Sequence, residues 1–156
     1  MSEIPTLRRA TAADGPAVRE LVFGILRDYG LATDAHTNAD LDDFDSHYSS
    51  RGGDFTVLVT DAGRVIGCVG LYRIDDATIE LRKMYLDAAW RGRGLGRRLL
   101  THGLERARAL GARKVTLETA GILKKAIALY TRAGFRLVEG GVHSCRCDLA
   151  MELDLS

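Results

Sequence analysis

The sequence has little of what marks disordered, secreted or membrane-spanning chains. Two prolines occur in 156 residues, and there is no low-complexity tract, which argues against disorder. The first residues, Met-Ser-Glu-Ile-Pro, lack the apolar core of a secretion signal. No apolar run approaches the roughly 20 residues that span a bilayer. We therefore expect a cytoplasmic protein with no membrane partner.

Neither sign of charge is in excess. The 22 basic and 21 acidic residues leave a formal net charge of +1. Such a balance supplies no global attraction to nucleic acid or to an anionic surface. We therefore expect no nucleic-acid partner.

Cysteine is also scarce. The three cysteines are Cys68, Cys145 and Cys147, and an odd number without a secretion signal indicates reduced thiols. Cys145 and Cys147 have no second ligand pair at zinc spacing, so we predict no metal site. Both would share one face of a strand, where packing explains them.

Hydrophobic residues make up 46% of the chain, enough to fill the core of one domain. Their spacing predicts a strand, two helices, three strands, a helix, a strand, a helix and two strands. This alternation is typical of an α/β protein whose mixed sheet has antiparallel and parallel parts. The expected strands are Ile4–Arg9, Phe55–Thr60, Val65–Tyr72, Ala77–Leu86, Lys114–Thr119, Phe135–Glu139 and Cys145–Leu155. The expected helices run from Thr11 to Gly30, Asn38 to Tyr48, Gly96 to Gly111 and Leu123 to Ala133.

The segment from Trp90 to Arg98 has the strongest functional signal. It holds three glycines and four arginines between an expected strand and an expected helix. Such a loop presents backbone N–H groups and a helix N-terminus to an anion. The P-loop string is absent, and Gly92-x-Gly94-x-Gly96 departs from the dinucleotide fingerprint in its final spacing. The segment predicts a phosphorylated ligand of another kind.

Two motifs connect this loop to a known family. Arg91-x-x-Gly94-x-Gly96 resembles the acetyl-CoA loop of the GNAT family of N-acetyltransferases. Ala126-x-x-Leu129-Tyr130-x-x-x-Gly134-Phe135 is similar to that family's second signature. The resemblance implies a single N-acetyltransferase domain over residues 1–156, with acetyl-CoA as co-substrate. It implies transfer of an acetyl group to a primary amine of a small molecule or peptide by direct attack on the thioester. Family members often pair through their last strands, so a homodimer is a further expectation.

The resemblance also implies which residues bind the co-substrate. The backbone of Met84, Tyr85 and Leu86 would pair with the pantetheine arm as an added strand does. Arg91 begins the loop motif, and the backbone N–H groups around the pyrophosphate would come from Gly92, Arg93, Gly94, Leu95, Gly96 and Arg97. Arg93, Arg97 or Arg98 would meet the 3′-phosphate.

Three side chains are candidates for catalysis. Tyr130 matches the family tyrosine that points at the cofactor sulfur, and would protonate the leaving thiolate; the alternative is that it only packs. Glu118 matches a strand position that serves as base in some relatives, and Glu80 lies on the preceding strand. Either glutamate, or a water molecule, would take the proton from the amine; the alternative for both is a salt bridge, with Arg82 and Lys83 nearby. The N–H of Leu86 is the expected oxyanion donor.

One position departs from the family pattern. Leu123 stands where many relatives have an asparagine that bonds the cofactor's arm. The departure keeps a second interpretation open, a non-catalytic domain that binds acyl-CoA as a sensor or scaffold. The acceptor site is expected in residues 31–54, the Tyr72–Ala77 turn and the Gly140–Cys145 turn. The aspartates of residues 31–54 would either be solvated or attract a cationic amine.

Overall fold

The computed structural model describes residues 4–31, 38–139 and 147–156. Its strands are β1 (Thr6–Arg9), β2 (Asp54–Val59), β3 (Val65–Arg73), β4 (Thr78–Leu86), β5 (Lys114–Thr119), β6 (Arg136–Val138) and β7 (Leu149–Asp154). Its α-helices are α1 (Gly15–Asp28), α2 (Phe44–His47), α3 (Leu95–Ala109) and α4 (Lys124–Arg132). The predicted order of elements is confirmed.

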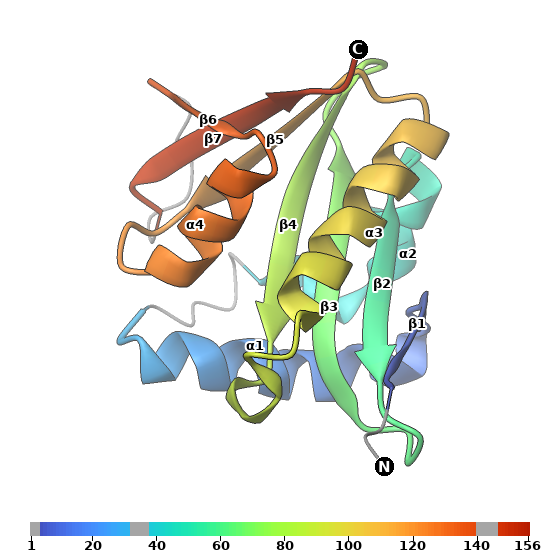
Figure 1. Ribbon diagram of the computed structural model, residues 1–156. Coiled ribbons are helices and arrows are strands. Elements are labelled where there is room, and N and C mark those ends of the chain that lie inside the picture. Colours follow the sequence, from blue (N-terminus) through green and yellow to red (C-terminus); the bar gives the residue numbers. More distant parts are fainter. Residues whose placement is uncertain (1–3, 32–37, 140–146) are drawn as a thin grey trace.

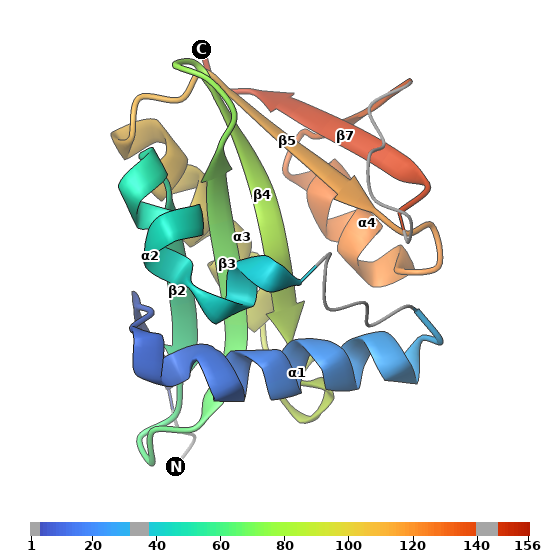
Figure 2. The same cartoon turned by 180° about the vertical axis from the view of Figure 1, so that it is seen from behind.

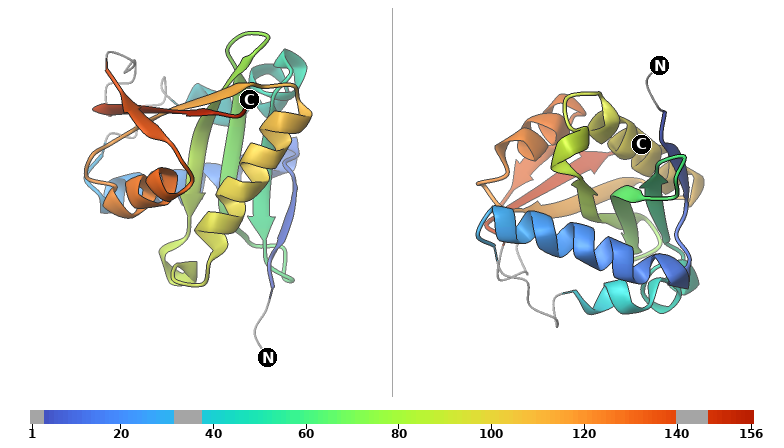
Figure 3. Two further views of the ribbon diagram at one scale, coloured as in Figure 1. Left: turned by 45° about the horizontal axis from the view of Figure 1, so that its top comes forward. Right: turned by 90° about the horizontal axis from the view of Figure 1, so that it is seen from below.

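The strands form one sheet in the order β1-β2-β3-β4-β5-β7-β6. The pair β4–β5 is parallel, and the other pairs are antiparallel. Helices α3 and α4 cover one face (Figure 1), and α1 and α2 cover the other (Figure 2). Seen from below, α1 lies on one side of the strands and α3 with α4 on the other (Figure 3). The mixed α/β sheet expected from the sequence is therefore confirmed.

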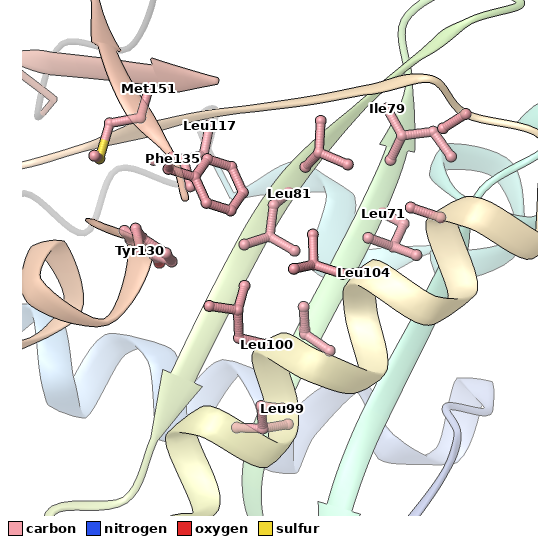
Figure 4. Packing of buried hydrophobic residues seen from close by; sticks show 14 of the residues in the cluster. Leu71, Ile79, Leu81, Leu99, Leu100, Leu104, Leu117, Tyr130, Phe135 and Met151 are labelled. Carbon is pink, nitrogen blue, oxygen red and sulfur yellow. The ribbon is translucent and has the colours of Figure 1, made fainter. Parts of the chain in front are cut away.

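Apolar spacing explains which face of each helix is buried. The predicted stripe of α3, namely Leu99, Leu100, Leu104 and Ala107, is at most 8% exposed. Figure 4 shows Leu99, Leu100 and Leu104 on the side of α3 that faces the sheet, where Leu71, Ile79 and Leu81 belong to the same cluster. On the other face, Val18, Val22 and Leu26 of α1 pack with Phe55 and Val57 in a second cluster. The sheet is therefore buried on both sides, and its central strands have little freedom to shift.

The expected helix over Asn38–Tyr48 is broken into short pieces. A 3-10 turn covers Ala39–Asp42, α2 covers four residues, and a second 3-10 turn covers Ser49–Arg51. The break falls at Asp43, whose backbone is not helical and whose side chain accepts a hydrogen bond from the Ser46 N–H. Aspartate favours such caps over helix interiors because its side chain competes for backbone N–H groups.

The last strand begins later than expected. Leu149 is its first residue, because Asp148 is bonded to the segment after β5: its carboxylate accepts from the Gly121 N–H at 2.6 Å. Cys147 therefore precedes the strand, and the expectation that it shares a strand face with Cys145 is wrong for Cys147. Cys145 lies outside the described residues, as does the Gly140–Cys145 turn. Helix α3 begins at Leu95, one residue before the expected Gly96.

Among the residues described, none of the helices has the length and apolar character that a bilayer crossing requires.

Candidate active site

The strands β4 and β5 separate in the middle of the sheet. Their ladder has three pairs, from Thr78–Lys114 to Glu80–Thr116. Beyond Glu80, β4 stays paired with β3 as far as Leu86, while β5 continues alongside β7. Figure 1 shows the two strands diverging below this point. Among the residues that the structure describes, the edge of β4 that faces β5 thus has no strand partner from residue 81 to residue 86. Unpaired strand edges bind extended ligands.

A β-bulge lies in the same stretch of β4, in its ladder with β3. The pairing of β3 with β4 shifts between Cys68–Tyr85 and Gly70–Arg82, and Lys83 has a φ of 53°. An extra residue of this kind bends a strand and redirects its groups. Met84, Tyr85 and Leu86, the predicted pantetheine-binding residues, directly follow the bulge on the open edge.

The bulge is held from the α2 side of the sheet. The Cys68 thiol donates to the Lys83 carbonyl at 3.0 Å. The Lys83 ammonium lies 3.2 Å from Oδ1 of Asp40, with side chains 6% and 5% exposed, and the Tyr48 hydroxyl donates to Asp40 Oδ2. The expectation that the aspartates of residues 31–54 are solvated is therefore wrong for Asp40, which is buried in this ion pair. It is also wrong for Asp54, which is buried and accepts from Arg106 Nε at 2.8 Å.

The glycine-containing loop continues from β4 into α3. Gly92 and Gly94 have φ values of 80° and 78°, a conformation that glycine adopts without steric cost. A Cβ at either position would meet no atom within 4 Å, so the space beside both is open. Gly94 caps α3 without a side-chain bond, which leaves N–H groups of the first turn available to an anion.

Arg91 and Arg93 stiffen the loop. The Arg91 guanidinium donates to the Leu86 carbonyl through Nη2 at 3.2 Å and Nε at 3.3 Å. Arg93 lies over the Trp90 ring, 4.6 Å from its centroid. Leu95, Gly96 and Arg97 form the start of α3. The structure therefore brings the predicted loop residues together beside the open edge of β4, with the Arg91 side chain directed at that strand.

Glu80 and Glu118 are neighbours on the face opposite α3. Glu80 is 8% exposed, and Arg82 Nε donates to its Oε1. Burial raises the pKa of Glu80, and the nearby Glu118 carboxyl raises it further, against the opposing effect of Arg82. A buried carboxylate with a raised pKa suits a proton acceptor. The structure brings both predicted glutamates together, and it also contains the alternative salt bridge to Arg82.

Tyr130 lies on α4 and belongs to the hydrophobic cluster that also contains Leu99, Leu100 and Leu104 of α3. It is 6% exposed and packs edge-to-face on Phe135 with centroids 5.7 Å apart (Figure 4). Burial raises the pKa of Tyr130, with smaller contributions from Tyr85 and Cys147. The phenol is therefore protonated at neutral pH, and it lies within electrostatic range of Tyr85 on the open edge.

No individual role near this site was predicted for Arg82, Tyr72 or Asp40. From the sequence, Arg82 was named only as a salt-bridge partner, Tyr72 only as the residue where a strand ends and a turn begins, and Asp40 only as one of the aspartates of residues 31–54. For Arg82 a signal exists, because residues two apart in a strand share a face, and Arg82 follows Glu80 by two. For Asp40 none does, since its partner Lys83 is distant in the sequence. Leu123 precedes α4 as its cap residue and gives no side-chain hydrogen bond. Within the described residues, no three His, Cys, Asp or Glu side chains gather where a metal ion would bind.

Comparison with known proteins gives consistent matches. A family model described as "Acetyltransferase (GNAT) family" matches residues 20–135. The chain is 36% identical over 141 residues to an uncharacterized N-acetyltransferase, YjgM, of Escherichia coli, covering 86% of this chain and 84% of that protein. It is 32% identical over 106 residues to N-acetylaspartate synthetase of Danio rerio, covering 67% of this chain and 38% of that protein.

Solved structures agree. A GNAT acetyltransferase of Staphylococcus aureus superposes with a TM-score of 0.93 at 19% identity, covering 98% of this chain and all of that one; this likeness shows the fold. A phosphinothricin acetyltransferase of Sinorhizobium meliloti, solved with acetyl-CoA, superposes at 0.76 with 26% identity, covering 97% of this chain and 88% of that one. The acetyltransferase yncA of Salmonella typhimurium, also solved with acetyl-CoA, superposes at 0.73 with 25% identity and covers 98% of this chain and 95% of that one. Acetyl-CoA fits as the co-substrate, because an open strand edge adjoins a loop of exposed N–H groups. The family match, the curated relatives and the fold lead to one conclusion: the chain belongs to the acetyltransferase (GNAT) family.

Proposed function

We propose that this chain is an N-acetyltransferase domain over residues 1–156 that transfers an acetyl group from acetyl-CoA to a primary amine by direct attack on the thioester. The observation that supports it most is the unpaired edge of β4 beyond Glu80, which leads directly into the loop at the start of α3. An extended pantetheine arm pairs with such an edge, and a pyrophosphate binds at such a loop. Acetyl-CoA supplies the acetyl group as an activated thioester.

The residues of the loop bind by their backbone. The N–H groups from Gly92 to Arg97 face the pyrophosphate, while Met84, Tyr85 and Leu86 pair with the arm. Arg91 holds the Leu86 carbonyl, and so keeps the end of β4 in place beneath the loop. The N–H of Leu86 donates to the oxygen on which charge develops, a contribution that in other enzymes is among the largest.

Glu80 is the proposed base, with Glu118 as its partner. Because its pKa is raised, Glu80 has a higher affinity for a proton than an exposed glutamate, and so one closer to that of an amine. Arg82 fixes the position of its carboxylate. Glu118 or a water molecule is the alternative acceptor of the proton. Tyr130 is the proposed acid because it occupies the position of the family tyrosine and its hydroxyl carries a proton at neutral pH. Burial raises the pKa of this hydroxyl, which in itself makes release of the proton harder, so the position in the motif carries the assignment.

Direct transfer agrees with the state of the buried thiol. Burial raises the pKa of Cys68 to about 12, and its proton is donated to the Lys83 carbonyl. A thiol in this state is a poor nucleophile, so Cys68 does not carry the acetyl group.

Two measurements on paired variants test the proposal. Tyr130→Phe keeps the ring that packs on Phe135, so acetyl-CoA affinity by calorimetry should stay near that of the parent, while turnover falls about tenfold or more. Tyr29→Phe, on the end of α1, is the matched control and should leave both unchanged. Unaltered turnover in Tyr130→Phe would remove Tyr130 from the mechanism, and no binding of acetyl-CoA by the parent protein would end the proposal.

The non-catalytic alternative remains a distinct outcome. Leu123 offers no amide to the cofactor's arm, and this departure from the family pattern leaves room for a domain that binds acyl-CoA without using it. A protein that binds acetyl-CoA but releases no free thiol with any amine would support this alternative. A cytoplasmic location and a homodimer stay predictions.

A further inference from the structure

The sheet face opposite α3 carries a compact group of charged side chains around Tyr72. Tyr72 of β3 is paired with Glu80 of β4, and Gly70 with Arg82. Glu80 is paired in turn with Thr116 of β5, two residues before Glu118. Because paired residues and residues two apart share a face, Tyr72, Glu80, Arg82 and Glu118 lie on one surface beside the point where β4 and β5 separate.

Arg82 is held by one side of its guanidinium. The group lies 3.7 Å from the centroid of the Tyr72 ring, and Nε donates to Glu80. The side chain is 35% exposed, and the two terminal nitrogens have no hydrogen-bond partner among the residues that the structure describes. Terminal guanidinium nitrogens form a planar fork that matches the two oxygens of a carboxylate.

A second guanidinium lies on the same ring. Arg51 is 4.3 Å from the Tyr72 centroid, and its Nη2 donates to the Arg73 carbonyl at 3.2 Å. Tyr72 therefore gathers two cations that come from different segments, one fixed in β4 and one exposed at the surface. An amine without a negative group would be repelled by this pair.

The two carboxylates, Glu80 and Glu118, attract a cation where the two arginines attract an anion. Glu80 and Glu118 interact closely, and a cationic ammonium group is a natural partner for such a pair. The group as a whole thus has two positive and two negative side chains, arranged so that one molecule with both an ammonium and a carboxylate meets a complementary charge at each end.

We propose, resting on the function proposed above, that the acceptor is an amine that also carries a carboxylate, such as an α-amino acid, and that Arg82 binds this carboxylate. The Glu80 carboxylate keeps its hydrogen bond from Arg82 Nε, while the carboxylate of the substrate accepts from the two terminal nitrogens. Arg51 adds a second, more exposed charge at the rim. Arg82 is in this sense a specificity-determining residue, since it selects the acceptor without contacting the thioester.

The test compares amino acids with the amines left when their carboxylate is removed: phenylalanine with phenethylamine, and lysine with cadaverine. Free-thiol release from acetyl-CoA gives kcat and KM for each. For the parent protein, kcat/KM should be about tenfold to a hundredfold higher for the amino acid of each pair, the range expected of one charge-assisted bidentate contact.

Variants locate the effect. Arg82→Gln should raise KM for the amino acid by about tenfold or more. Because Arg82 also holds the carboxylate of the proposed base Glu80, its rate with the matched amine changes as well. The quantity compared is therefore the ratio of kcat/KM within each pair, which should fall to about one in this variant. Arg51→Gln, at an exposed position, should weaken the preference in the same direction and serves as the fold-safe variant. Arg108→Gln on α3 is the control. A purely structural role for Arg82 would lower the rates for both members of a pair alike.

Different results would overturn the amino-acid acceptor and the acetyltransferase activity itself. Equal kcat/KM for both members of each pair, or a preference that Arg82→Gln and Arg51→Gln leave intact, overturns the inference while the transferase proposal stands. Absence of acetyl transfer to every amine in the panel overturns both.

Discussion

Replacement of Lys83 tests whether the buried ion pair holds the bulge on β4. Its ammonium lies 3.2 Å from Asp40, with both side chains about as buried as core residues. Among the described residues, Lys83 is the cation within salt-bridge distance of this carboxylate. Lys83→Met would leave Asp40 buried with the Tyr48 hydroxyl as its partner. Breaking a buried pair in this way costs about 3–5 kcal/mol, a large part of the stability of a small domain.

Urea unfolding followed by circular dichroism measures the loss. Lys83→Met should lower the free energy of unfolding by about 3–5 kcal/mol with an unchanged m value. Arg64→Met is the control: it breaks the Arg64–Asp87 pair at 2.9 Å, whose arginine is 66% exposed, and should cost about 0–1 kcal/mol. The double variant Asp40→Asn/Lys83→Met removes both charges and should recover most of the loss. A cost below about 1 kcal/mol for Lys83→Met, or no recovery in the double variant, would refute the reasoning.

Three further predictions concern the core, the loop and the base. Gly70→Ala should cost about 1–3 kcal/mol of unfolding free energy, because the new Cβ would lie 2.9 Å from the rings of both Phe55 and Tyr48. A melting temperature equal to that of the parent would contradict this. Gly94→Glu should abolish acetyl-CoA binding in calorimetry by bulk and charge at the loop, whereas retained heat would show that the pyrophosphate binds elsewhere. Because the folded pKa of Glu80 is raised, kcat/KM should fall as pH drops through that raised value. The stability that protonation of Glu80 provides is present below its ordinary pKa and lost as pH rises through the raised one. Glu80→Gln should therefore remove the acid limb of the pH–rate profile, and should also flatten this part of the stability profile; an unchanged limb would assign the base elsewhere.

The sequence was sufficient for the fold because apolar periodicity is a local signal. The stripe of α3 follows from its spacing, and β2 and β3 follow from apolar, β-branched runs on either side of a turn; both strands are buried on both faces and show no alternation. The break at Asp43 was not visible in that pattern, since it arises when an aspartate side chain caps a backbone N–H instead of staying in a helix. The start of β7 was misplaced for a similar reason: Asp148 bonds a loop that is distant in the sequence.

The candidate site was predictable in its motifs and less so in its surroundings. The glycines of the loop predicted a site for a phosphorylated ligand; the left-handed backbone at Gly92 and Gly94 was found only in the structure. The neighbourhood of the two glutamates depended on the parallel register of β4 and β5, which spacing along the chain does not give. The pair of Asp40 with Lys83 depends on how the broken segment after α1 folds over the sheet, so no linear pattern pointed to it.

The bulge on β4 has a consequence for what insertions and deletions this strand tolerates. Leu81, Met84 and Leu86 pack in the hydrophobic cluster on the α3 side of the sheet, whereas Tyr85 packs in the cluster on the α1 side. In a regular strand, strict alternation would assign Met84 and Leu86 to the side opposite Leu81. Loss of the single residue at position 83 would therefore restore regular alternation, with Met84, Tyr85 and Leu86 on their present sides and in their present pairs with β3. A chain one residue shorter here would keep every neighbouring motif and yet lose the carbonyl that accepts from Cys68, the ammonium beside Asp40 and the bend that the bulge gives the open edge.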